Sequence, residues 1–326
     1  MVSRGSDEFD RPSESVEWMI TAASEDTYDQ LIEPHRAELR AHCYRMLGST
    51  HDAEDALQDA LLRAWRGLAR FEGRSSVRTW LYRVATNACL DLMRRRPPHP
   101  AEWPDPFPDE LMEVEDGLAS PAARYERRES VELAFVAALQ NLPATQRAAL
   151  LLRDVLGFSA KETAAALDTT VPSANGALRR ARTAIEAGLP ERTQQATLRE
   201  LGDDEVRGVV ERYADAFERC DLDALVAMLA EDASFSMPPL PDRFDGLGEI
   251  VPFLERGPLR VRWRHVPTRA NGQPAVGCYM WDARRGAYAF HVLDVLTFRG
   301  PRIAAVTAFI DPELFAGFGL PDELPA

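Results

Sequence analysis

The 326-residue sequence has no paired cysteines, no long apolar run and almost no lysine. Its four cysteines (Cys43, Cys89, Cys220 and Cys278) lie far apart without a CxxC pair, which argues against a disulfide framework and a four-cysteine zinc site. No stretch approaches the roughly 20 apolar residues of a membrane span. The polar, acidic start MVSRGSDEFD has no apolar core of a secretion signal. We therefore expect a cytoplasmic protein without a metal centre or a membrane partner.

Charge is unevenly distributed along the chain. The net charge of −14 alone argues against a nucleic-acid-binding protein. Residues 63–96, however, carry nine arginines against two acidic residues, a balance of +7. Residues 97–121 carry seven acidic residues and no arginine or lysine, and residues 203–326 have a balance of −7. A basic block between acidic neighbours indicates a phosphate-facing surface. Nearly all the positive charge is arginine, a bias that a GC-rich genome would also produce.

Composition and hydrophobic pattern divide the chain into six parts. They are an acidic extension (1–27), a helical segment (28–96), a linker (97–121), a second helical segment (122–187), a short polar linker (188–203) and a mixed domain (204–326). The first linker holds seven prolines, so we expect it to be extended, self-repelling and without a helix or strand. The mixed domain should be α+β, with helices over 204–219 and 222–230 and strands over 259–268, 274–282, 286–298 and 302–310.

A helix-turn-helix pattern lies at residues 158–182. Ser159 and Glu162 form a capping box that opens a short helix. Asp168-Thr169-Thr170 makes the turn, and Pro172 suits the first turn of the next helix. That second helix presents small and polar side chains that can approach bases and phosphates in a major groove, namely Ser173, Asn175, Gly176, Arg179 and Arg180. An ordinary helical hairpin with solvated arginines is the alternative.

Two earlier segments carry charge in other patterns. Residues 51–66 cluster acidic side chains near the start of a helix, where the macrodipole favours them, and such a cluster is often a solvated face. Its apolar stripe runs from Ala53 to Trp65. Residues 71–96 interleave aromatic residues with arginines and hydroxyls, which supply stacking planes and cations for single-stranded DNA. The alternative places Trp80 and Leu81 in the core, with the arginines merely exposed.

In this order, and with the acidic linker between them, the three segments closely resemble bacterial sigma factors of the extracytoplasmic-function (ECF) group. HDAEDALQDALLRAWR is similar to their region 2.2, FEGRSSVRTWLYRVATNACLDLMRRR to regions 2.3–2.4, and LPATQRAALLLRDVLGFSAKETAAALDTTVPSANGALRRAR to region 4. The resemblance covers about residues 28–187 and implies two all-α domains, a region 2 helical bundle and a region 4 helix-turn-helix. No region 1.1 or region 3 domain is visible, as in this minimal group.

The resemblance also implies contact residues. The polymerase β′ clamp would be bound by Asp52, Glu54, Asp55, Gln58 and Asp59. The −10 element would be bound by Arg74, Ser75, Ser76, Arg78, Trp80, Arg83, Asn87, Arg94, Arg95 and Arg96, and the −35 element by Ser173, Asn175, Arg179 and Arg180. The implied partners are promoter DNA and core RNA polymerase, through its β′ clamp and β flap. No cofactor is implied, and the linker would thread toward the RNA exit path. Pro172 and Gly176 depart from the better helix formers usual in the −35 helix.

Residues 204–326 resemble the SnoaL-like cone, through VVERYADAFERCDLDALVAMLAEDASFSMPP and FDGLGEIVPFLERG. A subset of ECF sigma factors carries such a domain, whose fold encloses a pocket between helices and a curved sheet. Strand alternation predicts one face with Tyr288, Phe290, Val292 and Asp294 and another with His291, Leu293 and Val295. The candidate pocket residues are Trp263, His265, Tyr279, Trp281, His291 and Asp294. They suit an aromatic core with satisfied polar groups equally well.

Three functions compete on the sequence. The favoured one is a promoter-specificity factor that its cone modulates in cis, helped by the opposite charges of the cone and of residues 63–96. The alternatives are a bifunctional protein whose cone binds or turns over a small molecule, and a DNA-binding repressor. The region 2.2 acids argue against a repressor, which needs no clamp-binding face. A sigma factor makes no bonds itself, so we expect no catalytic residue and no enzyme.

Overall fold

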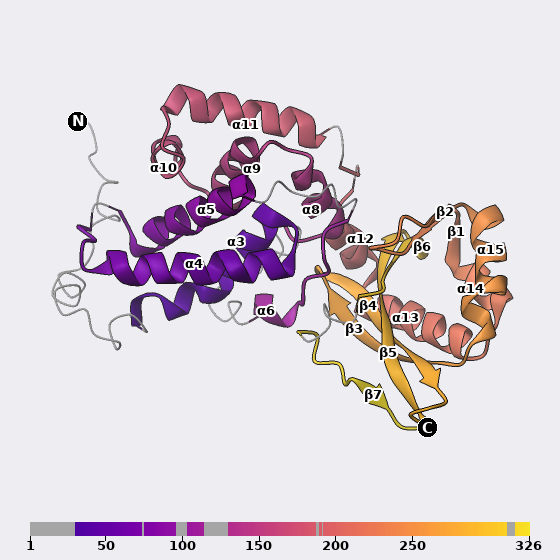
Figure 1. Cartoon of the computed structure of the whole chain (residues 1–326). Coiled ribbons are helices and arrows are strands. Elements are labelled where there is room, and N and C mark those ends of the chain that lie inside the picture. The colour runs from indigo at the N-terminus through magenta and orange to yellow at the C-terminus, as the bar shows by residue number, and fades with distance from the viewer. Residues whose placement is uncertain are drawn as a thin grey trace. The chain divides into compact units, whose positions relative to one another are not determined.

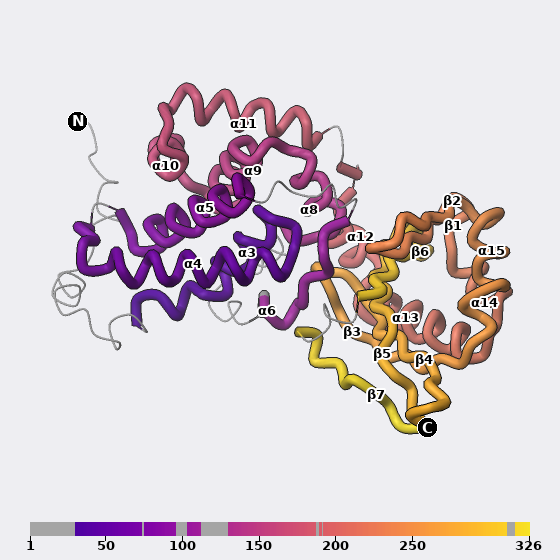
Figure 2. The backbone as a smooth tube through the Cα atoms, viewed as in Figure 1, coloured from indigo at the N-terminus to yellow at the C-terminus, as the bar shows by residue number. Residues whose placement is uncertain are grey.

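The computed structural model describes residues 30–73, 75–95, 103–113, 130–186, 189–190, 192–311 and 317–326. Arg74, Arg96, the acidic extension 1–27 and the start of the helix predicted from 122 lie outside this described part. Two compact units make up the chain, Met1–Pro100 with Ala137–Leu189, and Ala101–Val136 with Pro190–Ala326 (Figures 1 and 2). The acidic linker therefore belongs with the C-terminal domain. Among the described residues, no helix is long and apolar enough to cross a membrane.

The first unit is helical. Its elements are η1 (Glu33–His35), α3 (Arg36–Leu47), α4 (Thr50–Leu68), α5 (Val77–Arg95), α9 (Ala144–Leu150), the π-helical turn η3 (Leu151–Val155), α10 (Ala160–Ala166) and α11 (Val171–Glu186). The helix α8 (Leu133–Gln140) leads into it from the second unit. Gly48 ends α3 with a φ of 73°, and the Ser49 hydroxyl caps α4 by accepting from Asp52 N. Gly48 and Ser49 thus separate α3 from α4.

A buried arginine ties α9 to α3. Arg147 is 1% exposed and donates to the backbone oxygens of Met46, Gln140 (2.9 Å) and Leu142 (3.2 Å), and to the Gln140 side chain. Burial lowers the pKa of Arg147 to about 10. The contact joins α9 to the end of α3 and to the end of α8 within the first unit.

The second unit is α+β, as predicted. It comprises α6 (Glu110–Glu113), α12 (Gln194–Leu201), α13 (Asp203–Glu218), α14 (Leu222–Met228), β1 (Leu229–Ser236), β2 (Arg243–Asp245), α15 (Leu247–Arg256), η4 (Pro258–Arg260), β3 (Trp263–Ala270), β4 (Gln273–Asp282), β5 (Ala287–Arg299), β6 (Arg302–Phe309) and β7 (Glu323–Leu324). The sheet runs β2-β1-β6-β5-β4-β3, with β7 on β5, and only the β1–β6 pair is parallel.

The sheet buries both faces. On one face, Tyr213 and Phe217 of α13 and Ile250 of α15 pack in one cluster with sheet residues such as Val276 and Leu296. On the other face, Ala275, Leu293, Val295 and Phe309 pack with Leu133 from the start of α8 and with Phe318. A residue next to the linker thus belongs to the core of the cone.

Four predictions about elements are wrong. The proline-rich linker contains α6, and the polar stretch 188–203 contains α12, whose long polar side chains are buried. The chain is already a strand at Leu229, where a helix was expected to 230. A bulge pairs Cys278 with Val292 but Tyr279 with Phe290, so β5 gains one residue at this point. Phe290 therefore packs with Leu293 and Val295, against the expected alternation.

Candidate functional site

The exposed face of α4 carries part of the predicted polymerase contact. Asp55 and Gln58 are exposed, whereas Asp52, Glu54 and Asp59 are half-buried. Two large apolar side chains continue the exposed face, Leu62 at 55% and Trp65 at 42% exposure. The prediction that Trp65 belongs to the core stripe is wrong, and Leu62 was missed. The spacing of Asp55, Gln58, Leu62 and Trp65 by three or four residues was the signal that could have revealed this row.

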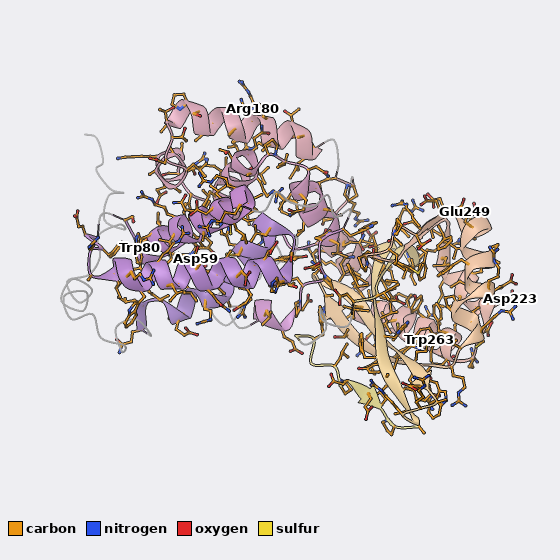
Figure 3. The ribbon with its side chains drawn as sticks, viewed as in Figure 1. Asp59, Trp80, Arg180, Asp223, Glu249 and Trp263 are labelled. Carbon is orange, nitrogen blue, oxygen red and sulfur yellow. The ribbon has the colours of Figure 1, made fainter. Side chains whose placement is uncertain are left out.

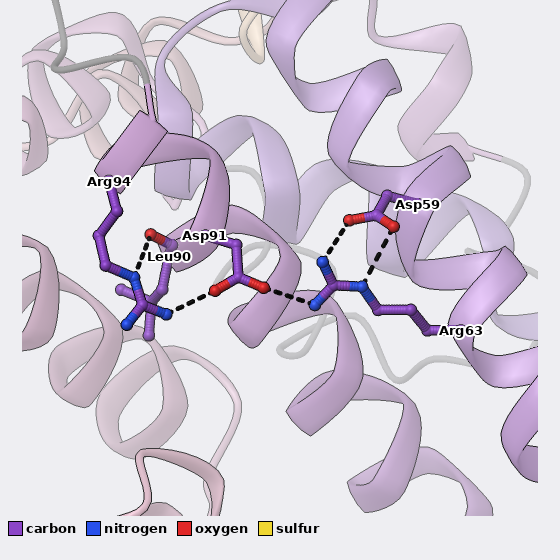
Figure 4. Close-up of polar contacts among 5 residues, drawn as sticks. All are labelled: Asp59, Arg63, Leu90, Asp91 and Arg94. Carbon is purple, nitrogen blue, oxygen red and sulfur yellow. Dashed lines mark hydrogen bonds and ion pairs between the residues drawn. The ribbon is translucent and has the colours of Figure 1, made fainter.

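A chain of four charges joins α4 to α5 (Figure 4). Asp59 accepts from Arg63 Nε (3.1 Å) and from a terminal guanidinium nitrogen (2.6 Å), and Arg63 also donates to Asp91 at 2.7 Å. Arg94 donates to Asp91 at 2.5 Å. Burial raises the pKa of Asp91, but the hydrogen bonds and charges of Arg63 and Arg94 outweigh burial and lower it. Asp59 and Arg94, predicted for two different partners, are thus the ends of one network.

The start of α5 presents hydroxyls and an aromatic ring. Ser76 Oγ accepts from Thr79 N (3.1 Å) and donates to Thr79 Oγ1 (2.9 Å), which donates to Glu162 at 3.3 Å. Trp80 is half-buried, with its ring centroid 5.0 Å from that of Phe71. A side chain at Gly67 would approach the Trp80 ring to 3.2 Å, so the indole lies on the α4 backbone (Figure 3). The Trp80 ring is less exposed than the predicted DNA contact requires and less buried than the alternative, a core residue, requires.

The other residues predicted at the −10 element differ in how they are held. Arg78 Nε donates to Glu38 at 3.1 Å, and its guanidinium lies 4.8 Å over the Tyr82 ring. Burial raises the pKa of Glu38, but His35, Arg78 and Tyr82 outweigh burial and lower it. The remaining described members are exposed (Arg83, Arg94, Arg95) or half-buried (Ser75, Asn87). Arg78 is therefore engaged within the bundle, and the exposed arginines form the outward cationic surface.

The helix α11 presents the predicted −35 residues on its exposed side, which are Ser173, Asn175, Arg179 and Arg180. Ala174, Ala177, Leu178 and Ala181 are buried beneath them. Arg180 extends outward from α11 in Figure 3. Arg182 donates twice to Asp154, at 2.8 and 2.6 Å, and so fixes α11 to η3. The predicted capping box is present, since Ser159 and Glu162 exchange hydrogen bonds of 2.8 and 3.2 Å.

The candidate pocket residues of the cone fall into two groups. Trp281 and His291 line a cavity of about 840 Å³ together with Asp282, Arg284, Arg285 and Asp322. The other four do not line it. Asp294 is buried and accepts from the Tyr213 hydroxyl (2.8 Å) and the Cys278 thiol (3.4 Å), and burial raises its pKa to about 6. Burial lowers the pKa of His265 to about 4.

The aromatic members of the second group are packing residues. Tyr279 is fully buried, with its ring edge-on to Phe290 at 5.0 Å. Trp263 contacts the rings of His265 (6.2 Å) and His291 (5.9 Å). Asp294, whose carboxylate accepts two hydrogen bonds, fits the interpretation of a core with satisfied polar groups. Tyr279 and His265 fit it only in their packing, because the Tyr279 hydroxyl and His265 Nδ1 are buried without a hydrogen-bond partner among the described residues. In the part of the chain that the structure describes, no group of three His, Cys, Asp or Glu residues could hold a metal ion.

Known proteins match the whole of this arrangement. Residues 31–97 match the family model of sigma-70 region 2, residues 132–185 that of sigma-70 region 4, and residues 210–306 that of the SnoaL-like domain. The chain is 40% identical over 324 residues to the ECF RNA polymerase sigma factor SigG of Mycobacterium tuberculosis, with 90% of this chain and 83% of that protein covered. It is 35% identical over 158 residues to SigM of the same species, with 48% and 73% covered.

A solved structure shares the fold. The crystal structure of the M. tuberculosis extracytoplasmic function sigma factor SigJ covers 91% of this chain and 100% of its own, with a TM-score of 0.61 at 23% identity. The family models of two sigma regions and a SnoaL-like domain match the chain, and SigG matches it over 90% of its length. These matches assign the chain to one family. The chain belongs to the ECF RNA polymerase sigma factors.

Proposed function

We propose that this chain binds core RNA polymerase in the cytoplasm and directs it to promoters through their −10 and −35 elements. The observation that carries the proposal is the pairing, in one helical unit, of an acidic and apolar exposed face on α4 with an exposed polar row on α11. The first suits a protein partner and the second suits duplex DNA. Such a factor positions polymerase and makes no bonds itself, so the chain is not proposed to be an enzyme.

The α4 face has the composition of a protein-binding surface. Leu62 and Trp65 expose apolar area beside Asp55 and Gln58, and an apolar centre with a polar rim is typical of interaction hot spots. A face that only needed solubility would have no use for these two side chains. We therefore assign polymerase binding to this row, with Asp52, Glu54 and Asp59 as its half-buried border.

The two DNA contacts follow from exposure. Arg83 and Arg95 supply exposed cations along α5, the helix that also carries the Trp80 ring, as the strands of an opened −10 element require. On α11, Asn175 has the side chain that can read an adenine edge, while Arg179 and Arg180 suit guanine edges or phosphates. The acidic neighbours of this surface would weaken binding to other DNA.

Run-off transcription with core polymerase tests the proposal. Leu62→Ala should lower polymerase binding and transcription by about tenfold, as expected for one hot-spot side chain. The matched control is Leu240→Ala, because Leu240 is 47% exposed in the other unit and should leave transcription unchanged. Equal effects of the two substitutions, or none from Leu62→Ala, would contradict the assignment.

One observation favours the second candidate function, binding of a small molecule by the cone. The cavity of about 840 Å³ combines the aromatic side chains of Trp281 and His291 with two cations, Arg284 and Arg285, which can bind an aromatic anion. Two acids, Asp282 and Asp322, also line it and offset the charge of the arginines. Asp282 is paired with Arg285 at 3.5 Å, and Asp294, the buried acid with a raised pKa, does not line this cavity. Binding without turnover is the form proposed. Titration of tryptophan fluorescence with benzoate, in the natural chain and in Trp281→Phe, tests it.

A further inference from the structure

A single residue of the cone holds two distant points of the chain before α8. Asn271, 0% exposed in the turn between β3 and β4, donates from its backbone N to Phe107 O and accepts at Oδ1 from Phe107 N, both at 2.8 Å. Its Nδ2 donates to Val131 O, also at 2.8 Å. Phe107 and Val131 are 24 positions apart in the sequence, yet both contact the same side chain. Asn271 therefore holds both of these points at one turn of the cone.

Two buried carboxylates complete this contact. Asp109 is 6% exposed and accepts from Gly272 N at 2.7 Å and from Arg269 Nε at 3.0 Å. Glu132 is 3% exposed and accepts from the backbone N of Gln194 (3.1 Å) and of Gln195 (2.7 Å) at the start of α12. Because a buried carboxylate is strongly destabilised without partners, these bonds select one specific docked arrangement.

Apolar packing and backbone pairing reinforce it. Pro108 forms an antiparallel bridge with Ala270, and Phe107 is 1% exposed. Leu133 donates from its N to Gln273 Oε1 at 3.2 Å, and its side chain packs in the core of the cone. We call this set of contacts, made by residues 107–109 and 131–133 with 194–195 and 269–273, the clasp. Residues 107–109 of the acidic linker are thereby held by specific partners.

We propose that the cone carries a docking surface whose partner is the chain's own connection between the region 2 and region 4 domains, and that docking restrains transcription. The inference rests on the proposed sigma function for its consequence, though not for the contact itself. Residues buried in the clasp cannot contact polymerase at the same time. The clasp must therefore open wherever the linker follows a path through polymerase.

The clasp also limits how far the connection between the two sigma domains can extend. An open connection of residues 96–132 spans up to about 120–130 Å at 3.3–3.6 Å per residue. With the clasp closed, only residues 96–106 remain extensible, up to about 40 Å, plus roughly 10 Å across Asn271. Two promoter elements about 25 base pairs apart lie roughly 85 Å apart along the duplex, at 3.4 Å per base pair. A closed clasp therefore makes the connection shorter than this separation, and the two sigma domains must themselves bridge the remainder.

Amide hydrogen exchange on the full chain tests docking from the side of the cone. The amide of Gly272 donates to Asp109 in the linker, and those of Gln194 and Gln195 donate to Glu132 just before α8. Their protection therefore reports on the clasp even where polymerase covers the linker. Asp109→Asn should make Gly272 exchange about tenfold faster in the free chain. Glu110→Gln, a change of the neighbouring exposed acid, is the matched control and should leave exchange unchanged. Adding core polymerase should deprotect Gly272 in the natural chain.

Run-off transcription then tests whether the closed clasp restrains transcription. Asp109→Asn should raise run-off transcription roughly threefold and Glu110→Gln should not. A second set of substitutions locks the clasp closed instead of weakening it. Pro108→Cys with Ala270→Cys, in a Cys220→Ser background, places thiols on bridged residues, and oxidation should lower transcription until a reductant restores it. Protection of Gly272 that persists in the polymerase complex, or an oxidised lock that transcribes like the reduced form, would overturn the proposal. Absence of transcription from every form would instead count against the sigma function, while exchange in the free chain would still report docking.

Discussion

Asp294 is buried between α13 and the sheet, where Tyr213 and Cys278 donate to the same carboxylate oxygen. Burial raises its pKa to about 6, against the effect of these two hydrogen bonds. The folded chain therefore binds this proton more tightly than the unfolded chain does. The carboxyl contributes stability that is complete below about pH 4 and is lost as the pH rises through 6.

Asp294→Asn should remove this dependence on pH. Between pH 4 and pH 7.5, the free energy of unfolding of the natural chain should fall relative to that of the variant by about 2–3 kcal/mol. Urea unfolding at a series of pH values, followed in the transition of the cone, measures the difference. Parallel pH profiles for the two proteins would show that Asp294 does not titrate in this range.

Trp80→Ala with Arg83→Ala should abolish promoter melting and leave binding to core polymerase intact. The pair belongs to α5, whereas the row assigned to polymerase belongs to α4, and one lost stacking contact costs about 1–3 kcal/mol. Permanganate footprinting measures melting, and native gel electrophoresis measures binding. If the double variant melted promoters normally but failed to bind core, the roles of α4 and α5 would be reversed.

The two tryptophans show how far single residues can be predicted. Trp80 was predicted as an exposed stacking platform, and it is half-buried against Phe71 and Gly67. Trp65 was predicted as core and is 42% exposed. It follows directly after the buried Ala64, at the edge of an apolar stripe about 100° wide, where periodicity does not separate inside from outside.

Among the elements, α11 contains one glycine, Gly176, that the geometry of the helix does not require. Gly176 has no positive φ, and a side-chain carbon there would meet only Arg180, at 3.5 Å. Gly176→Ala should raise the free energy of unfolding by about 0.5–1 kcal/mol, because alanine is the better helix former. It should weaken binding to −35 duplex if the backbone approaches DNA closely at this point. Thermal unfolding and fluorescence anisotropy measure the two effects, and tighter DNA binding would contradict the close approach.

The exposed row of α11 leads to a separate test. Arg179→Ala and Arg180→Ala should each lower the slope of log affinity against log salt concentration by about 1, if each removes one phosphate contact. Asn175→Ala should leave the slope unchanged and relax sequence preference. Titration of −35 duplexes at four salt concentrations distinguishes the two classes. Indifference of all three variants to DNA would remove α11 from the interface.

Elements defined by local signals were predictable, and those held by distant partners were not. The bounds of α5 and the capping box of α10 follow from side chains within a few residues of one another. The helix α12 was missed because Gln194 and Gln195 are satisfied by Glu132, Gly272 and Phe298, which lie far away in the sequence. The bulge in β5 likewise depends on pairing with β4, which alternation in one strand cannot reveal.

At the scale of the whole molecule, composition misjudged the described part of the linker, residues 103–113. Seven acids without a base predicted self-repulsion. Asp109 nevertheless finds Arg269 and Gly272 N, 160 or more positions away. The two sigma regions and the cone were identified from their motifs. The motifs do not indicate which of these domains the linker residues contact.

Truncation after Arg192 removes most of the docking surface, including Asn271 and both glutamines. We expect run-off transcription from the truncated chain to rise roughly threefold, by the same release that Asp109→Asn produces. Circular dichroism of the truncated chain provides the control for folding of the helical unit. Unchanged or lower transcription from a folded truncated chain would mean that the cone does not restrain the sigma regions.

Because the clasp joins an early segment to a late one, it also depends on the order of synthesis. Asn271 follows Leu133 by 138 positions, which a ribosome translates in about 7–30 s. From the end of the region 4 match at residue 185 until Asn271 is made, 86 positions later, both sigma regions have been synthesised while the turn that would hold their connection does not yet exist. Each new molecule therefore passes through an unclasped period. A message cut short between these two points would leave its product in that condition permanently.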